Sequence, residues 1–257
     1  MIARWPRYTG LMLLVMLVGC TKKEPEQQSA QPQTTAAKPV VQPPVELADY
    51  YLGIIRKGSA WTAEETVAVA ELQRQHLARI NHLADSGVLA LAGPIEGGPG
   101  AEDLRGLFFY TVASMEEARA LADSDPSVRA GRLLVDIFQW RGPADLTYSE
   151  TDSMTDYQLV FYFKGPFYYA EETPPSFWGM VQTQTEKMGG IGDSCRIIMA
   201  GEFPDTNNDY NLVGMMVYQA PSLGQVNRVM AMASAIRGSR LSPRLMMWYG
   251  PVGLRCK

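Results

Sequence analysis

The chain contains few residues of the kinds that build metal sites, with only two histidines and three cysteines among its 257 residues. This supply excludes a protein with several zinc sites, because each such site takes three or four of these ligands. Basic residues are not in excess either: 23 Lys and Arg stand against 27 Asp and Glu, for a formal net charge of −4. A nucleic-acid-binding protein needs a basic face, so we expect no nucleic-acid partner. Because 46% of the residues are hydrophobic, most of the chain should fold around a core.

The chain also lacks a run of about 20 apolar residues, the length that a helix needs to span a membrane. A shorter apolar run, residues 11–18, follows Arg4 and Arg7 and precedes Gly19 and Cys20. A positive segment followed by a short apolar core is typical of a signal peptide. Residues 17–20, with the sequence LVGC, resemble the lipobox of bacterial lipoproteins. The resemblance implies that residues 1–19 are removed and that Cys20 carries the lipid; an ordinary secretory peptide or an uncleaved anchor is the alternative.

Residues 20–46 are predicted to be the lipidated cysteine and a disordered tether. The stretch 21–46 contains five prolines and no aromatic residue, so it cannot bury enough apolar surface to offset its ordering entropy. By resemblance to lipoprotein sorting, the non-acidic Thr21 implies a place on the inner leaflet of the outer membrane, facing the periplasm. In a host with one membrane, the protein would instead be anchored outside the plasma membrane. The expected partner is therefore a lipid bilayer.

The rest of the chain contains an internal repeat, which bears on the whole fold because repeated units pack against one another. Four short segments recur further along the chain at one constant offset, at 89–93 and 197–201, 106–110 and 214–218, 128–133 and 236–241, and 140–143 and 248–251. Chance does not keep one spacing over four separated segments. We therefore predict a tandem duplication, with one repeat at 47–144, a linker at 145–156 and a second repeat at 157–257.

Each predicted repeat has the element order βαββαβ. In the first, we expect strands at 50–57, 88–93, 106–112 and 133–140, a helix at 63–86, and a second helix that opens with a capping box at Ser114 and Glu117. This order is that of the ferredoxin-like α+β unit, whose sheet is covered by helices on one face only. The bare faces of the two sheets should then pack together, giving a monomer that is an intramolecular pseudo-dimer with an internal pseudo-twofold axis.

The first repeat resembles the YCII family of small proteins with the dimeric α+β barrel fold. The resemblance covers nearly all of residues 50–143 and rests on HLAR at 76–79, ADSGVL at 84–89, AGP at 92–94 and ADSDPSVRAG at 122–131. It implies a His–Asp pair in a cleft that performs acid–base work on small molecules. The second repeat resembles the family in pattern only.

The sequence indicates His76 as the site histidine and Asp125 as its partner. Helical spacing places His76 in the middle of the apolar face of its helix, where it could also be a core residue, whereas Asp85 falls on the opposite side and is the weaker candidate. At the offset of the repeat, Gln184 and Ala233 replace His76 and Asp125. Residues lost together are more simply explained as a working pair than as structural residues, so we predict His76 and Asp125 as the catalytic pair.

Two functions remain open from the sequence. The first is a periplasmic lipoprotein that binds a small molecule or an envelope partner without catalysis, which is favoured because the second repeat has lost the pair and the periplasm offers little metabolite chemistry. The second is an acid–base enzyme, of isomerase or lyase type, that uses His76 and Asp125 on a small molecule. We expect no cofactor and no metal.

Cys195 and Cys256 could form a disulfide, but the predicted strand order places them at opposite edges of a sheet, which favours free thiols.

Overall fold

A computed structural model of the chain describes residues 45–149, 153–169, 175–188, 195–205 and 208–256. The predicted signal peptide at 1–19, the lipidation site Cys20 and nearly all of the predicted tether at 20–46 lie outside these residues. None of the helices within the described ranges is long and apolar enough to cross a membrane.

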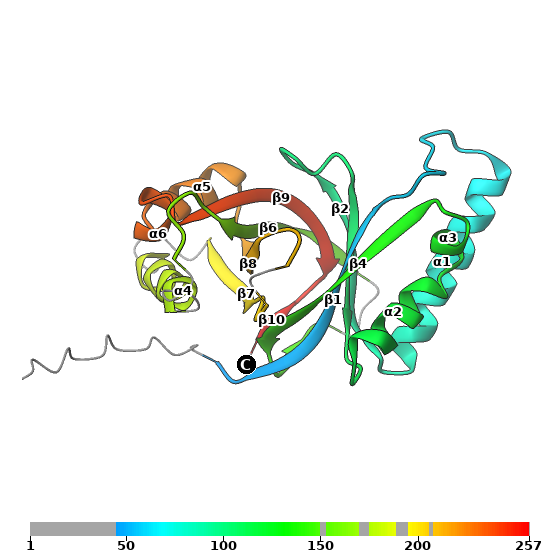
Figure 1. The fold of residues 1–257 in the computed structure, drawn as a ribbon, viewed down its shortest axis with the longest axis horizontal. Helices are drawn as coiled ribbons and strands as arrows, with labels where there is room; N and C mark the ends of the chain where they lie inside the picture. Colours follow the sequence, from blue (N-terminus) through cyan, green and yellow to red (C-terminus); the bar gives the residue numbers. More distant parts are fainter. Residues whose placement is uncertain (1–44, 150–152, 170–174, 189–194, 206–207, 257) are drawn as a thin grey trace, which may run out of the picture. The chain divides into compact units, whose positions relative to one another are not determined.

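The described chain consists of two halves with the same order of elements, which are shown in Figure 1. The first half contains β1 (Leu47–Lys57), α1 (Val67–Asp85), β2 (Leu89–Gly97), β3 (Leu104–Tyr110), α2 (Met115–Asp123), α3 (Pro126–Arg129) and β4 (Leu133–Pro143). The second half contains β6 (Met154–Lys164), α4 (Pro175–Met188), β7 (Arg196–Glu202), β8 (Leu212–Gln219), α5 (Leu223–Ala231), α6 (Ser234–Arg237) and β9 (Leu241–Pro251). A small ladder of β5 (Leu146–Thr147) and β10 (Arg255–Cys256) lies beside them.

The helices of the first half begin directly after capping residues, so α1 starts at Val67 rather than at the expected residue 63. The side chain of Thr66 accepts a hydrogen bond from the backbone of Val69 at the start of α1. Ser114 caps α2 in the same way, as the capping box predicts, whereas Glu117 reaches back one residue further than expected, to the N–H of Ala113 rather than that of Ser114. The second helix differs from the expectation because it is divided into α2 and α3. Asp125 has an extended backbone (φ −66°, ψ 132°), as residues before a proline usually do, and a new helical turn starts at Pro126.

The strands of both halves form one closed eight-stranded barrel, in the order β1-β3-β2-β9-β6-β8-β7-β4. In the first half β1 pairs with β4 from Leu47–Pro143 to Lys57–Leu133. The matching pair in the second half, β6 and β9, runs from Met154–Pro251 to Lys164–Leu241. The halves join where β2 meets β9 and where β4 meets β7, while α1–α3 cover the outside of one half and α4–α6 the outside of the other (Figure 1). The faces that the helices leave bare thus form the barrel interior.

Two buried tryptophans hold the halves together at these joints. A methyl group added to Gly201 in β7 would lie 2.2 Å from the ring of Trp140, which comes from the other half. Trp248 lies against Gly93 in the same way and donates its indole N–H to the Gly93 carbonyl at 3.2 Å. Both tryptophans are fully buried in the barrel core. The glycines are therefore needed because the partner half leaves no room for a side chain.

We expect Gly201→Ala to destabilise the barrel, because a Cβ cannot be placed against the Trp140 ring without moving it. Overpacking of this kind typically lowers the free energy of unfolding by about 1–3 kcal/mol. Chemical denaturation of the folded chain measures the loss. The matched control is Gly224→Ala in α5, where the new methyl group would meet no atom closer than 3.8 Å. Equal losses in the two variants would contradict the proposed contact.

Candidate functional site

Asp125 lies at the start of α3, where its backbone position fixes the direction of its carboxylate. One carboxylate oxygen, Oδ1, accepts hydrogen bonds from the backbone N–H groups of Ser127 (2.8 Å) and Val128 (3.4 Å). The residue is 3% exposed. The other oxygen, Oδ2, is left to face α1. The break before Pro126 therefore turns a capping residue into a buried acceptor that is held in one orientation.

His76 of α1 supplies the partner of that oxygen. Its Nδ1 lies 2.7 Å from Asp125 Oδ2, and the residue is 7% exposed. An ionised carboxylate only accepts hydrogen bonds, so the imidazole donates through Nδ1. Nε2 is then the ring nitrogen that is left to exchange a proton with a bound molecule. The structure thus brings together the two residues that the sequence indicated as a pair.

The surroundings of the pair restrict its movement and its chemistry. The Phe108 ring lies 6.2 Å from the imidazole, and Arg79, one helical turn beyond His76, donates to the Ser124 hydroxyl at 2.8 Å. Tyr110 is buried behind the pair; burial, and to a lesser degree the charge of Asp125, raise the pKa of its hydroxyl well above the ordinary value. Tyr110 therefore keeps its proton, and the free nitrogen of His76 is the basic group of this cluster.

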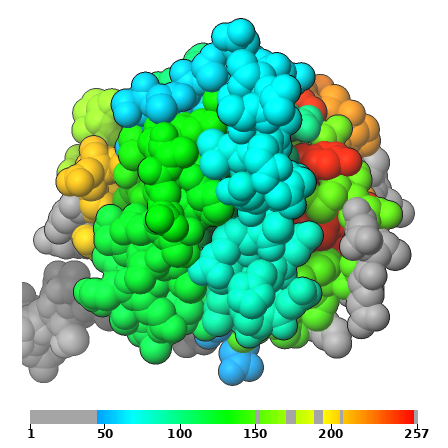
Figure 2. Space-filling view, turned by 90° about the vertical axis from the view of Figure 1, so that its right-hand side faces the viewer, coloured from blue at the N-terminus to red at the C-terminus, as the bar shows by residue number. Residues whose placement is uncertain are grey.

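The cavity beside His76 has a volume of about 630 Å³ and is mostly apolar. Its walls come from α1, the strands β1 to β4 and the loop before α1, with Tyr148, Met154 and Pro251 contributed by the chain beyond β4. Figure 2 views the molecule from the helical face of the first half, where α1 (cyan) lies beside α2 (green) and atoms of the second half (red and yellow-green) border α1. Leu77 and Tyr148, both about half exposed, lie on its rim. The volume suits a small organic molecule.

The other residues considered from the sequence take no part in the pair. Asp85 is exposed at the end of α1, and His82 is exposed as well. Cys195 is a buried free thiol, so it forms no disulfide with Cys256. Among the described residues, no three His, Cys, Asp or Glu side chains come together in a way that could hold a metal ion.

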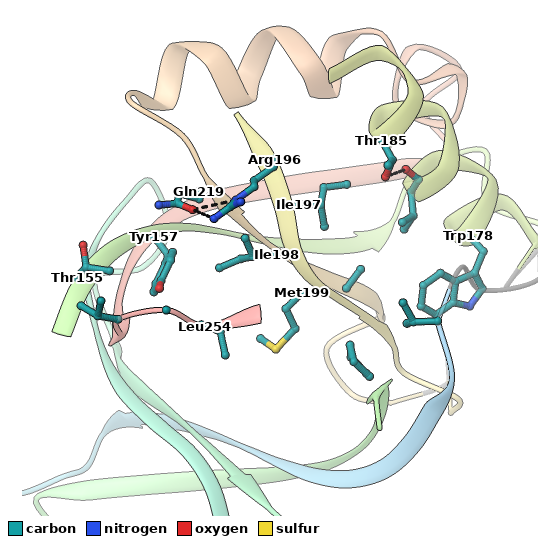
Figure 3. Close-up of a pocket in the computed structure, with 16 residues that line it drawn as sticks. Thr155, Tyr157, Trp178, Thr185, Arg196, Ile197, Ile198, Met199, Gln219 and Leu254 are labelled. Carbon is teal, nitrogen blue, oxygen red and sulfur yellow. Dashed lines mark hydrogen bonds between the residues drawn. The ribbon is translucent and has the colours of Figure 1, made fainter. Parts of the chain in front are cut away.

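A second cavity, of about 600 Å³, occupies the corresponding place in the second half (Figure 3). It lies between α4 and β7, and Pro143 of the first half borders it as Pro251 borders the first cavity. At its upper edge in the view, the exposed side chain of Arg196 donates to Gln219. The described residues that line it include neither histidine nor carboxylate.

The second half replaces the His–Asp pair with a different buried polar cluster. Gln184 is fully buried and accepts a hydrogen bond from the Tyr218 hydroxyl at 2.5 Å, and Tyr218 is in turn bonded to Tyr162 at 2.8 Å. Burial raises the pKa of both tyrosines, so this chain of groups stays neutral. Ala233, at the place of Asp125, begins α6 without any side-chain cap. The helical turn thus forms without an aspartate, and folding alone does not explain Asp125.

Sequence reasoning missed one lining residue of the first cavity, Arg105 at the start of β3. It lies beside Trp61, which also lines the cavity. A comparison of the two halves could have pointed to Arg105, because Val213 stands at the equivalent position of the second half. The second half therefore has no counterpart of Arg105, as it has none of His76 or Asp125.

Comparison with known proteins finds a family match for part of the chain. Residues 57–141 match the model of the YCII-related domain. The match includes His76 and Asp125 and lies within the first half. No curated protein is significantly similar to the chain.

Solved structures that resemble the chain share its fold at very low sequence identity. A mutant chlorite dismutase from Candidatus Nitrospira defluvii aligns with a TM-score of 0.51 and 9% identity, over 79% of this chain and 91% of that one. The same organism's chlorite dismutase in complex with imidazole aligns with a TM-score of 0.52 and 10% identity, over 79% and 90% of the two chains. The fold is therefore an α+β barrel similar to those of dimeric α+β barrel proteins.

We expect Asp125→Ala to release the His76 ring while the barrel still folds, because Ala233 starts the equivalent turn without a cap. In the wild type, ¹⁵N NMR should show a proton on Nδ1, held in the hydrogen bond to Asp125. In the variant this preference should disappear, and loss of the cap should lower the free energy of unfolding by about 1 kcal/mol. The exposed His82 serves as the internal control and should keep its signals. A wild-type ring protonated at Nε2 alone would contradict the assigned hydrogen bond.

Proposed function

We propose that the first half of the chain is an acid–base catalyst, of isomerase or lyase type, for a small organic molecule. The observation that carries the proposal is the position of His76, which bonds to Asp125 through one ring nitrogen and lines the cavity. A histidine held by a carboxylate and facing a cavity of ligand size is suited to general-base chemistry near neutral pH.

The proposed reaction begins with transfer of a proton from a carbon of the substrate to Nε2 of His76. The electron pair of the broken C–H bond stays on the substrate, and Asp125 stabilises the imidazolium that forms. In an isomerisation, His76 returns the proton to a different atom of the substrate. In an elimination, the electron pair forms a double bond as a leaving group departs with its own pair, and His76 gives its proton to the leaving group or to water.

The contrast between the halves favours catalysis over simple ligand binding. Both halves contain a cavity of similar size, so a cavity by itself does not require the pair. The second half folds with Gln184 and Ala233 at the same places, so the barrel does not require it either. We therefore infer that His76 and Asp125 act on the molecule that the first cavity binds.

We propose further that the two halves arose by tandem duplication. The proposal is supported by the matching strand registers of β1 with β4 and of β6 with β9, together with the four recurring sequence segments. The offset between β1 and β6 is one residue shorter than the offset between β2 and β7, as the equivalent pairs Lys57 and Lys164, and Leu89 and Ile197, show. A single insertion or deletion between the first two strands of one half accounts for this difference.

We expect the enzyme to exchange a substrate C–H proton for deuterium from the solvent. ¹H NMR in D₂O, with a panel of small carbonyl compounds, should show signals that fade with wild-type protein and not with His76→Gln. Gln is the matched substitution because Gln184 occupies the equivalent buried position. The control His82→Gln should retain full exchange. Compounds that bind saturably without any exchange, equally in wild type and His76→Gln, would favour the non-catalytic binding protein instead.

We propose that Cys20 anchors the chain to a membrane, with the folded part on the outer membrane facing the periplasm or, in a single-membrane host, outside the plasma membrane. The lipobox-like residues 17–20 support the proposal. In bacterial cells the full chain should fractionate with membranes, and mass spectrometry should find a diacylated Cys20 at its N-terminus. Cys20→Ala should abolish the modification, whereas Cys195→Ala, which alters a buried thiol, should not. An unmodified Cys20 in the mature protein would refute the anchor.

A further inference from the structure

The first cavity carries a concentration of positive charge at the end formed by β3 and the loop before α1. Arg105 and Trp61 line the cavity there, and the guanidinium carbon of Arg105 lies 4.6 Å from the centre of the Trp61 ring. Arg132 lies 4.4 Å and Lys57 6.0 Å from the same ring. Three cations thus surround one indole, an arrangement in which the ring face stabilises positive charge.

The hydrogen bonds of Arg105 go to the backbone rather than to a carboxylate. Its terminal nitrogens donate to the backbone carbonyls of Leu104 and Glu102, and its Nε is buried without an acceptor among the described residues. Nη1 of Arg132 is also buried and finds no acceptor in the described part of the chain. Burial lowers the pKa of Arg105, and the nearby Asp103 offsets this only in part. An arginine nevertheless stays charged, so its environment favours an added anion.

Within the described ranges, the lining of the cavity contains no Asp or Glu, and Arg105 is its one permanently charged residue. Since the remaining walls are mostly apolar, the cavity suits a molecule with an apolar body and one negative group. Each terminal nitrogen of Arg105 has one further N–H beyond its bond to the backbone, which matches the two oxygens of a carboxylate. A phosphate dianion would call for more donors than Arg105, the one cation among the described lining residues, provides.

The distance between the two polar ends of the cavity sets the size of the ligand. Phe108, next to the His76 ring, and Arg105 are three residues apart on β3, which is about 10 Å along a strand. A molecule with one ring or a short carbon chain covers that distance. Its reacting carbon can then lie at His76 while its negative group lies at Arg105.

We propose that the substrate of the His76 site is a small organic carboxylate, whose carboxylate group is bound by Arg105 beside Trp61. The proposal rests on the function proposed above for what the bound molecule undergoes, but the binding itself requires no turnover. It also explains why Val213 stands in the second half, where Gln184 and Ala233 have replaced the catalytic pair.

Benzoate and benzamide provide the test, because they have nearly the same shape and differ in charge. Titration of the folded chain, followed by tryptophan fluorescence and by the NMR signals of the His76 ring, should show saturable benzoate binding with a Kd of about 1 mM, as expected of a fragment of this size. Arg105→Val, which installs the residue of the second half, should weaken benzoate binding at least tenfold. Benzamide binding should change less than twofold, and Arg105→Lys should restore part of the benzoate affinity.

Three results would overturn the proposal. One is wild-type protein that shows no saturable change with benzoate up to about ten times the expected Kd. Another is an equal loss of benzoate and benzamide binding in Arg105→Val, which would indicate a structural role for the arginine. The third is inorganic phosphate that binds more tightly than benzoate at the same place.

The same titration separates this proposal from the catalytic one. If benzoate binding depends on Arg105 in both wild type and His76→Gln, the anion subsite stands even where no deuterium exchange is found. If exchange occurs and Arg105→Val leaves benzoate binding unchanged, the catalytic proposal stands and the subsite is refuted.

Discussion

The packing of Trp140 and Trp248 across the two joints of the barrel is the contact on which the rest of the structure depends. Each ring lies on a glycine of the opposite half, Gly201 and Gly93, and also over the glycine two residues further along its own strand. That second contact explains why a Trp-x-Gly-Pro segment ends both β4 and β9. The hydroxyls of Tyr50 and Tyr157 bond to the carbonyls of the two prolines, each at 2.8 Å, and fix the strand ends.

The cavities exist because of this closure. Pro251 and Pro143, at the ends of these strands, each border the cavity of the opposite half. A first half on its own would present His76 beside an incomplete wall. The second half therefore contributes to the wall of the first cavity, although Gln184 and Ala233 stand in it at the places of His76 and Asp125.

The elements of each half and the His76–Asp125 pair could be predicted from the sequence, because their signals are local or periodic. Helical spacing placed His76 on the inner face of α1, and the constant offset of the repeat singled out Asp125 over Asp85. The interruption between α2 and α3 could have been inferred from Pro126, since the residue before a proline avoids helical geometry. The closure of the barrel could not be read from one strand, because the Trp–Gly contacts join segments that lie in different halves of the chain.

Arg105 escaped prediction for a similar reason. Its meaning depends on Trp61, Arg132 and the cavity, none of which is near it in the sequence. His76 and Asp125 belong to the residue types of proton transfer, whereas an arginine at a strand end carries no such signal by itself. Only the comparison with Val213 would have drawn attention to it.

Because His76 and Arg105 line one apolar cavity, the proposed substrate binding and proton transfer would support each other. In the proposed arrangement, the negative group of the bound molecule lies at Arg105, about 10 Å along β3 from the end of the cavity beside His76. Asp125 bonds directly to the His76 ring and is therefore the group that stabilises the imidazolium. Under the proposal, Arg105 holds the substrate in place while His76 and Asp125 carry the proton transfer. In the second half, where Gln184 has no charge to gain, an anion-binding arginine would serve no such purpose, and valine fills its place.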